Sequence, residues 1–367
     1  MQKNLRLKLK ILHVDTEKTW RGGEQQVLYL AKGLKDRGHE SRILCQPNSP
    51  LFERAKAEKL WVDEVKMRSE FDLLAAWRIG KLLRQEDYDI LHTHTSHAHS
   101  IGLLARFFGK AKVMVVSRRV DFPIRSRFKY NASDVHYIAV SEAVKRVLIK
   151  GGVSAQKIEI VRSCIDLERF DKAEIRDVRT GWDISKDAVV IGNIAHMADH
   201  KGQIYLIRAA DIIKRRWPNV RFVIVGDGEL RGELEAEARK LALDGVMIFA
   251  GFRKDIPSIL ASFDIFAFPS HLEGLGTSLL DAMAMKKPIV STTAGGIPEV
   301  VEDCVNGILV PPKDHKSLAT AIIRLVEDDA LRFRYGNAGR RIVEERFTVD
   351  RMAEKTEAVY KKFLSIP

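Results

Sequence analysis

The acidic side chains best placed for chemistry lie in the segment Ser270–Ala284. An apolar run over residues 264–269 precedes it and indicates a buried strand, so Glu273 should lie on a loop at that strand's carboxyl end. A helix is predicted to begin near Thr277. Asp281 stands eight positions after Glu273, which allows two carboxylates to reach different parts of one extended ligand. A capped helix with an incidental pair of acids explains the spacing equally well.

Two glycines, Gly274 and Gly276, stand directly before this predicted helix. Glycine allows a ligand to approach the backbone closely. The amides and dipole of a helix N-terminus favour an anion. The arrangement suits the diphosphate of a nucleotide sugar.

Strand-like and helical patterns alternate along the first half of the chain, as in βαβ units that form a parallel sheet. Strands are predicted at 9–14, 41–45, 90–92, 113–117, 137–140 and 158–161, and helices at 24–37, 51–59 and 73–85.

The same rhythm restarts after a polar stretch at 166–186. Here strands are predicted at 188–194, 220–225, 246–250, 265–269, 289–291 and 307–310, and helices at 204–216 and 230–243. The pattern predicts an α/β protein with two Rossmann-like, doubly wound domains, 1–165 and 166–345. Ligands on such sheets bind at the carboxyl ends of the strands, so the site is expected in a cleft between the domains.

The segment with Glu273 and Asp281 resembles the Glu-x7-Glu signature of the family-4 retaining glycosyltransferases, which have the GT-B fold. Similar stretches span nearly the whole chain: Gly22–Glu24, Gly226–Gly228, Gly251–Phe252, Lys287–Glu299 and Asn306–Gly307. The resemblance implies a retaining hexosyltransferase that moves a sugar from a nucleotide-sugar donor to a hydroxyl of a glycan or glycolipid. Bacterial members act in lipopolysaccharide or cell-surface polysaccharide synthesis. It also implies that residues 346–367 form a final helix that crosses back onto the first domain.

The resemblance assigns roles in the second domain. Glu273 faces the donor sugar, and Asp281 takes the place of the usual Glu that bonds the nucleotide ribose, with a side chain one methylene shorter. Lys201 matches a Lys that neutralises the leaving diphosphate, whereas His196 stands where an Arg is expected. A loop histidine without catalytic weight remains the alternative for His196. The expected catalytic residues are Glu273, Lys201 and His196, and the expected donor-binding residues are Gly22, Gly23, Gly274, Leu275, Gly276, Thr277 and Asp281.

The first domain is expected to bind the acceptor. His97 lies in a run in which His alternates with small or polar residues, His92–His99, which resembles a cleft loop of the family. Arg118 lies at the end of a strand where many members have a His, and Arg118 and Arg119 are expected to bind phosphate or face a membrane. A solvated basic loop is the alternative. The histidine run could also suggest a metal, but no carboxylate or cysteine partner stands nearby in sequence, so no metal site is predicted. No cofactor is expected either.

Charge divides unevenly between the halves of the chain. Residues 1–165 carry 31 Lys and Arg against 18 Asp and Glu, whereas residues 166–367 carry 30 against 31. The excess suggests an anionic acceptor or an anionic membrane met by the first domain, notably through Arg118, Arg119, Arg125, Arg127 and Lys129. Three scattered cysteines, the lack of a signal-peptide core and the lack of a bilayer-spanning apolar run predict a cytoplasmic protein, peripheral on the inner membrane face.

Three alternatives remain from the sequence. A nucleotide-sugar epimerase or a phosphorylase could use the same architecture, although no lysine for pyridoxal phosphate can be identified. A nucleic-acid-binding protein would fit the pI of about 9.5, but aromatic and basic residues interleave in one loop only. We therefore expect no nucleic-acid partner.

Overall fold

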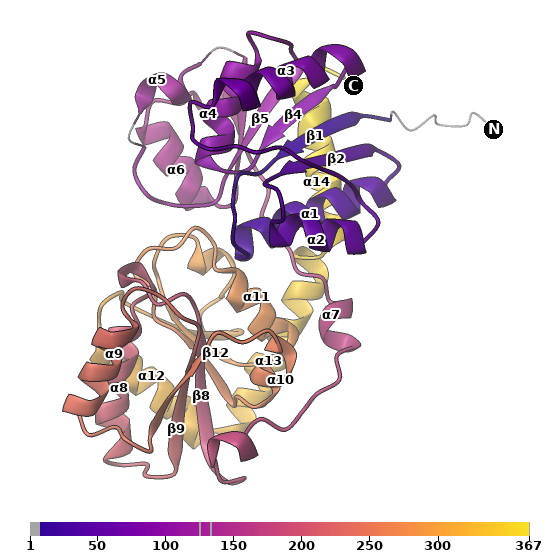
Figure 1. The fold of residues 1–367 in the computed structure, drawn as a ribbon. Coiled ribbons are helices and arrows are strands. Elements are labelled where there is room, and N and C mark those ends of the chain that lie inside the picture. Colours follow the sequence, from indigo (N-terminus) through magenta and orange to yellow (C-terminus); the bar gives the residue numbers. More distant parts are fainter. Residues whose placement is uncertain (1–7, 125, 133, 367) are drawn as a thin grey trace. The chain divides into compact units, whose positions relative to one another are not determined.

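The computed structural model describes residues 8–124, 126–132 and 134–366, without the side chains of residues 127 and 128. The chain forms two compact units (Figure 1). The N-terminal unit contains the described residues up to Cys164 together with the chain from Val349 onward. The C-terminal unit is Ile165–Thr348.

A parallel sheet of seven strands forms the centre of the N-terminal unit, in the order β3-β2-β1-β4-β5-β6-β7. The strands are β1 Lys10–Val14, β2 Glu40–Cys45, β3 Trp61–Glu64, β4 Ile90–Thr93, β5 Val113–Arg118, β6 Val135–Ala139 and β7 Ile158–Ile160. The helices are α1 Gly22–Asp36, α2 Pro50–Ala57, α3 Leu73–Glu86, α4 Ser96–Ala105, α5 Arg127–Tyr130, α6 Glu142–Lys150 and the C-terminal α14 Val349–Phe363, with a 3-10 turn η1 at Ala155–Lys157.

The C-terminal unit has a six-stranded parallel sheet in the order β10-β9-β8-β11-β12-β13. The strands are β8 Val189–Ile194, β9 Val220–Val225, β10 Met247–Gly251, β11 Ile265–Phe268, β12 Ile289–Thr292 and β13 Gly307–Val310. The helices are α7 Glu168–Asp171, α8 Gln203–Lys214, α9 Arg231–Lys240, α10 Ile256–Ala261, α11 Thr277–Ala284, α12 His315–Glu327 and α13 Asp329–Arg346. Short 3-10 turns are η2 Thr180–Trp182, η3 Asp199–Lys201 and η4 Ile297–Glu299.

These two sheets confirm the predicted fold class of two Rossmann-like α/β domains. Several elements were absent from the sequence prediction: the strand β3 and the helices α4, α5, α6, α7, α10, α12 and α13. The His92–His99 run is not a loop throughout, because Thr95 caps a helix by accepting a hydrogen bond from the Ala98 amide, and α4 begins at Ser96. The short edge strand β3 was not predicted, since its four residues are exposed or half-buried and lack an apolar pattern.

Each unit has its own apolar core. In the C-terminal unit β8, β9 and β11 pack against α8 and α12 through residues such as Ile191, Phe222 and Ile322. In the N-terminal unit α14 covers the sheet beside α1, and Tyr360 and Met352 join the core around Ile11 and Ile90. No helix among the described residues is long and apolar enough to cross a membrane.

Candidate functional site

The strand order of the C-terminal sheet reverses direction between the neighbouring strands β8 and β11. The chain runs outward from β8 through β9 to β10, and β11, β12 and β13 then extend the other side. Such a switch point is where open α/β sheets bind ligands, outside the carboxyl ends of the strands. Lys201 follows β8 and Glu273 follows β11, so these two predicted catalytic residues flank the switch point.

Lys201 and Glu273 form a direct ion pair, with 2.6 Å between Nζ of the lysine and Oε2 of the glutamate. The exposed fractions of the two side chains are 19% and 11%, so water screens the pair weakly. The ring of Phe268 lies 5.6 Å from Nζ. The pair places one cationic and one anionic group side by side on a mostly covered surface.

Backbone hydrogen bonds brace the loop that carries Glu273. The carbonyl of His200 accepts from the amides of His271 and Leu272, at 2.9 and 3.4 Å. The amide of Gly296 donates to the carbonyl of Glu273 itself at 2.9 Å. The loops that follow β8, β11 and β12 are thereby tied together, which holds the glutamate in position.

Helix α11 begins at Thr277, as predicted, directly after Gly276. Gly276 has a φ of +89°, a conformation that L side chains rarely adopt. Leu275 and Gly274 are buried, while Thr277 is half-buried in the first turn. The predicted donor-binding stretch is thus a tight turn that leads into a helix N-terminus at the carboxyl edge of the sheet.

Asp281 is a half-buried residue of α11. Burial raises the pKa of its carboxyl to about 6, against the opposing charge of Arg169. Among the described residues nothing donates a hydrogen bond to this carboxylate. It can therefore accept a hydrogen bond from a ligand hydroxyl, and such a bond would favour the ionised form.

His196 lies outside the Lys201–Glu273 pair. Its Nε2 is 3.0 Å from Oε2 of Glu229, and both side chains are exposed. Gly226 and Gly228, in the loop after β9, approach the backbone of the His196 segment so closely that a Cβ would come within 2.0 Å of Ala195 O and 2.4 Å of Met197 O, respectively. The two loops form one packed surface with His196 at its edge.

In the N-terminal unit Gly22 and Gly23 are the first two residues of α1, which follows β1. The amide of Arg21 donates to the carboxylate of the buried Glu24 at 2.6 Å. A Cβ at Gly23 would meet nothing within 4 Å. Gly23 therefore leaves open space beside the backbone in the first turn of α1, as close approach of a ligand would require.

The switch point of the N-terminal sheet lies between β1 and β4, and a cluster of buried histidines occupies it. His13 stands opposite His92 in the strand register, and His13 Nδ1 is 2.9 Å from His94 Nε2. Burial lowers the pKa of His13 to about 3 and lowers the pKa of His92 and His94 well below the usual value. The cluster is neutral at physiological pH.

A metal ion fits this cluster poorly, although its ligand atoms lie within 4.8 Å of one another. Both nitrogens of His92 already have partners, at 2.6 Å to the Tyr360 hydroxyl and 2.8 Å to the Ser117 hydroxyl. The guanidinium of Arg119 stands 3.4 Å from His94 Nδ1, where its positive charge opposes a cation. We interpret the histidines as a hydrogen-bonded polar core.

His13, which belongs to this cluster, and Asp15, two residues further on, were not singled out from the sequence. Asp15 is buried, and burial raises the pKa of its carboxyl to about 7. Their positions along the chain were the available signal. His13 lies near the end of β1 and Asp15 directly follows it. Since β1 and the strand with His92 are parallel neighbours, their carboxyl ends meet at one edge of the sheet.

The predicted acceptor residues occupy three different environments. His97 is exposed in the first turn of α4. Arg118 donates to the Tyr130 hydroxyl at 2.6 Å and to the carbonyl of Phe122. Half-buried Arg119 lies against the histidine cluster, and burial lowers its pKa. Arg125 and the side chain of Arg127 lie outside the described residues.

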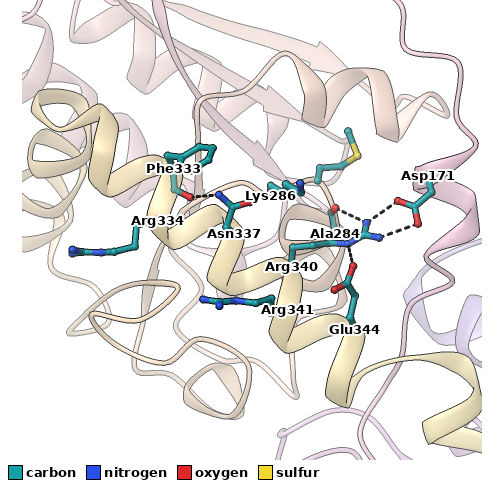
Figure 2. A pocket seen from close by; sticks show the side chains of 10 residues that line it. Asp171, Ala284, Lys286, Phe333, Arg334, Asn337, Arg340, Arg341 and Glu344 are labelled. Carbon is teal, nitrogen blue, oxygen red and sulfur yellow. Dashed lines mark hydrogen bonds and ion pairs between the residues drawn. The ribbon is translucent and has the colours of Figure 1, made fainter.

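A separate groove of about 740 Å³ follows α13 in the C-terminal unit (Figure 2). Figure 2 shows Arg340 bonded to Asp171, Glu344 and the carbonyl of Ala284. These contacts fasten α7 and the end of α11 to α13. None of the predicted site residues lines the groove, which we interpret as structural.

The fold and the switch-point site can now be compared with known proteins. Residues 174–342 match the family "Glycosyl transferases group 1", and residues 20–169 match "Glycosyltransferase Family 4". The chain is therefore a glycosyltransferase, and its two parallel-sheet domains have the GT-B fold.

Particular relatives match over almost their full length. An Escherichia coli UDP-Gal:alpha-D-GlcNAc-diphosphoundecaprenol alpha-1,3-galactosyltransferase is 25% identical over 98% of both chains. The lipopolysaccharide core biosynthesis glycosyltransferase LpsE of Rhizobium meliloti is 26% identical over 90% of this chain and 92% of its own. Among solved structures, Anabaena HepE in complex with UDP and glucose superposes with a TM-score of 0.83 at 23% identity, over 96% of this chain and all of the other.

Proposed function

We propose that this glycosyltransferase transfers a hexose from a UDP-sugar, with retention at the anomeric carbon, to a hydroxyl of a lipid-linked, anionic glycan acceptor. The observation that carries the proposal is the Lys201–Glu273 pair at the switch point, beside the N-terminus of α11. The UDP named for HepE and for the Escherichia coli relative supports the choice of base. Both family matches are to glycosyltransferases, so an epimerase, a phosphorylase or a nucleic-acid-binding protein has no support.

Lys201 would act as the charge that stabilises the departing diphosphate. Its ammonium has three donors, of which one reaches Glu273, so others remain for phosphate oxygens. The α11 N-terminus adds backbone donors and a positive dipole. Positive charge already present in the site would stabilise the leaving group as negative charge develops on it, without a divalent metal.

Glu273 would hold the donor sugar and keep Lys201 in position. A carboxylate has about four lone-pair positions, so Glu273 can accept from Lys201 and from a sugar hydroxyl at the same time. Asp281 would accept from a ribose hydroxyl of the nucleotide. With no second acid assigned as a nucleophile, we favour a front-face displacement in which the leaving diphosphate helps to deprotonate the acceptor hydroxyl.

The acceptor is assigned to the N-terminal unit, which carries the basic excess. The relatives named for a diphosphoundecaprenol substrate and for lipopolysaccharide core synthesis support an anionic glycolipid in cell-surface glycan synthesis. Such an acceptor resides in a membrane, so the enzyme would work in the cytoplasm, peripherally on the inner face of the cytoplasmic membrane.

The proposal can be tested by thermal shift with UDP-, GDP- and ADP-sugars, followed by turnover assays with the sugar that binds. A ligand that binds only the folded protein raises its apparent stability. We expect the largest shift with a UDP-sugar, and a smaller one in Lys201→Ala. Equal shifts with all three nucleotides, or none, would contradict the donor assignment.

A further inference from the structure

Large apolar side chains are exposed on and beside the packed helices α3 and α4 of the N-terminal unit. Phe71 is 70% exposed, Leu73 62% and Phe107 84%. Trp77 and Leu74, on α3, are also exposed. Contiguous exposed apolar surface of this kind marks a contact with a partner or a membrane.

The packing of α3 against α4 brings these side chains together. The helices lie side by side in Figure 1 and are in contact. A Cβ at Gly80 of α3 would come within 2.5 Å of both Ala105 O and the Phe108 side chain, so the end of α4 sits directly on α3. Phe108 therefore packs against α3 at Gly80, three positions after Trp77, and Phe107 lines a pocket together with Phe71, just before α3.

Basic residues surround this apolar surface. On α3, Arg78, Lys81 and Arg84 are exposed, and Lys81 Nζ lies 5.5 Å from the Trp77 ring. Lys110, just beyond α4, is exposed as well. Tryptophan and phenylalanine with flanking lysine and arginine are the composition of surfaces that insert at the headgroup level of anionic bilayers.

A pocket of about 990 Å³ opens on the same face. Its apolar walls are Phe71, Leu103, Leu104 and Phe107, and Arg106 and Lys110 also line it. Among the described residues that line it the acidic one is Glu70, which accepts from the Ser100 hydroxyl and lies 3.9 Å from Lys129. Apolar walls with cations beside them complement a hydrocarbon chain that ends in an anionic headgroup.

From these observations we infer that the α3–α4 face is a membrane-docking surface, where the aromatic and leucine side chains enter an anionic bilayer and the pocket takes part of one anionic lipid. This inference rests on the proposed lipid-linked acceptor and names the surface that meets its membrane. This surface is not the arginine loop that was expected from the sequence to face a membrane. Arg119 of that loop lies against the histidine cluster, and Arg118 is bonded within the loop itself.

Charge favours a bilayer over a protein as the occupant. The exposed cations on this face, with Glu70 engaged by Ser100, would be complemented by a continuous anionic surface. Each basic group near such a surface contributes about 1 kcal/mol, or roughly a fivefold change in binding.

The test is co-sedimentation of the full chain with neutral phosphatidylcholine vesicles and with vesicles containing phosphatidylglycerol. We expect binding to the anionic vesicles that weakens with salt. Trp77→Ser with Phe107→Ser should lower binding on the order of tenfold or more, since inserted aromatic surface is lost. The matched control is Phe333→Ser, which removes a 76% exposed phenylalanine from α13 in the groove of Figure 2 and should leave binding unchanged.

Two readouts separate this inference from the proposed function. The thermal shift with a UDP-sugar and turnover with a detergent-free, short-chain acceptor should be the same in the double variant and wild type. Unchanged vesicle binding in the double variant, or equal binding to neutral and anionic vesicles, would overturn the docking surface while leaving the glycosyltransferase proposal intact. A wild-type dimer that the double variant converts to a monomer would also overturn it, by assigning the face to self-association.

Discussion

The two sheets of this glycosyltransferase have switch points with the same topology but different electrostatics. Between β8 and β11 the chain keeps a full positive and a full negative charge 2.6 Å apart, in Lys201 and Glu273. Between β1 and β4 it places neutral histidines and Asp15, whose pKa is raised by burial. An ion pair is thus retained where we propose that the diphosphate binds, whereas in the other unit burial favours the neutral forms of the histidines and of Asp15, and Arg119 is the cation beside them.

This difference shows that sheet topology determines where loops from distant parts of the chain meet. The side chains on those loops determine whether that place can bind a ligand. Parallel strands bring loops distant in sequence to one edge in both units. In the C-terminal unit the loops bring the Lys201–Glu273 ion pair next to the start of α11, where we propose that the donor binds. In the N-terminal unit hydrogen bonds among His13, His92 and His94 and their neighbours use most of the polar groups internally.

The largest effect is expected from the buried carboxyl of Asp15 in the N-terminal unit. The pKa of Asp15 is raised from 3.8 to about 7 in the folded protein, so folding takes up a proton between these values. Its contribution to stability is therefore fully favourable at the acid end and is lost as pH rises towards and through 7, by at most about 4 kcal/mol. Asp15→Asn should remove this loss and make the variant more stable than wild type at pH 8.

Urea unfolding at pH 5 and pH 8 measures this effect. Asp36→Asn, at an exposed position on α1, is the control and should not alter the pH dependence. If Asp15→Asn is no more stable than wild type at pH 8, Asp15 is not the source of a proton-linked loss of stability, and the contrast between the units weakens.

The second prediction concerns the charged switch point. Glu273→Gln keeps the size of the side chain but removes its charge, and should cut turnover on the order of 10²-fold or more while the thermal melt is retained. Glu345→Gln, on the exposed side of α13, is the matched control. Near-normal turnover in Glu273→Gln would remove this glutamate from the reaction centre.

A third, smaller effect is expected at Lys201. Lys201→Ala should weaken binding of the nucleoside diphosphate on the order of tenfold, since a charge-assisted hydrogen bond contributes about 1.5–3 kcal/mol. Titration calorimetry measures the affinity of Lys201→Ala for the nucleoside diphosphate. The control is Lys240→Ala, which changes an exposed lysine of α9 and should leave the affinity unchanged. Unchanged affinity in Lys201→Ala would contradict the proposal that Lys201 binds the diphosphate.

The smallest expected effect is that of chelation. If Lys201, His196 and the α11 N-terminus supply the positive potential, prolonged treatment with EDTA should leave turnover unchanged. Loss of activity that magnesium or manganese restores would show that the charged switch point needs a cation as well. The same assay after Glu229→Gln would show whether the contact with His196 matters to the reaction.

Patterns within short stretches of the sequence determined most of the secondary structure and part of the candidate site. The alternation of apolar strands with helices predicted all strands of the C-terminal sheet and all but β3 of the N-terminal sheet, and the glycines before Thr277 predicted the start of α11. Such signals arise within a few residues. The family-like spacing also named Lys201 and Glu273, although their ion pair depends on two strands that are adjacent only in the folded sheet.

Tertiary structure decided the rest. The sequence showed His92 and His94 in a strand and the turn after it, but only the pairing of β1 with β4 adds His13, buries the cluster and lowers its pKa values. Likewise, Arg118 and Arg119 read as a basic loop, yet packing directs Arg119 to His94, while α3 and α4 bring Trp77 and Phe107 to one face. The reason is physical: local pattern determines which element a residue belongs to, whereas burial and charge depend on neighbours that the chain brings together from distant positions.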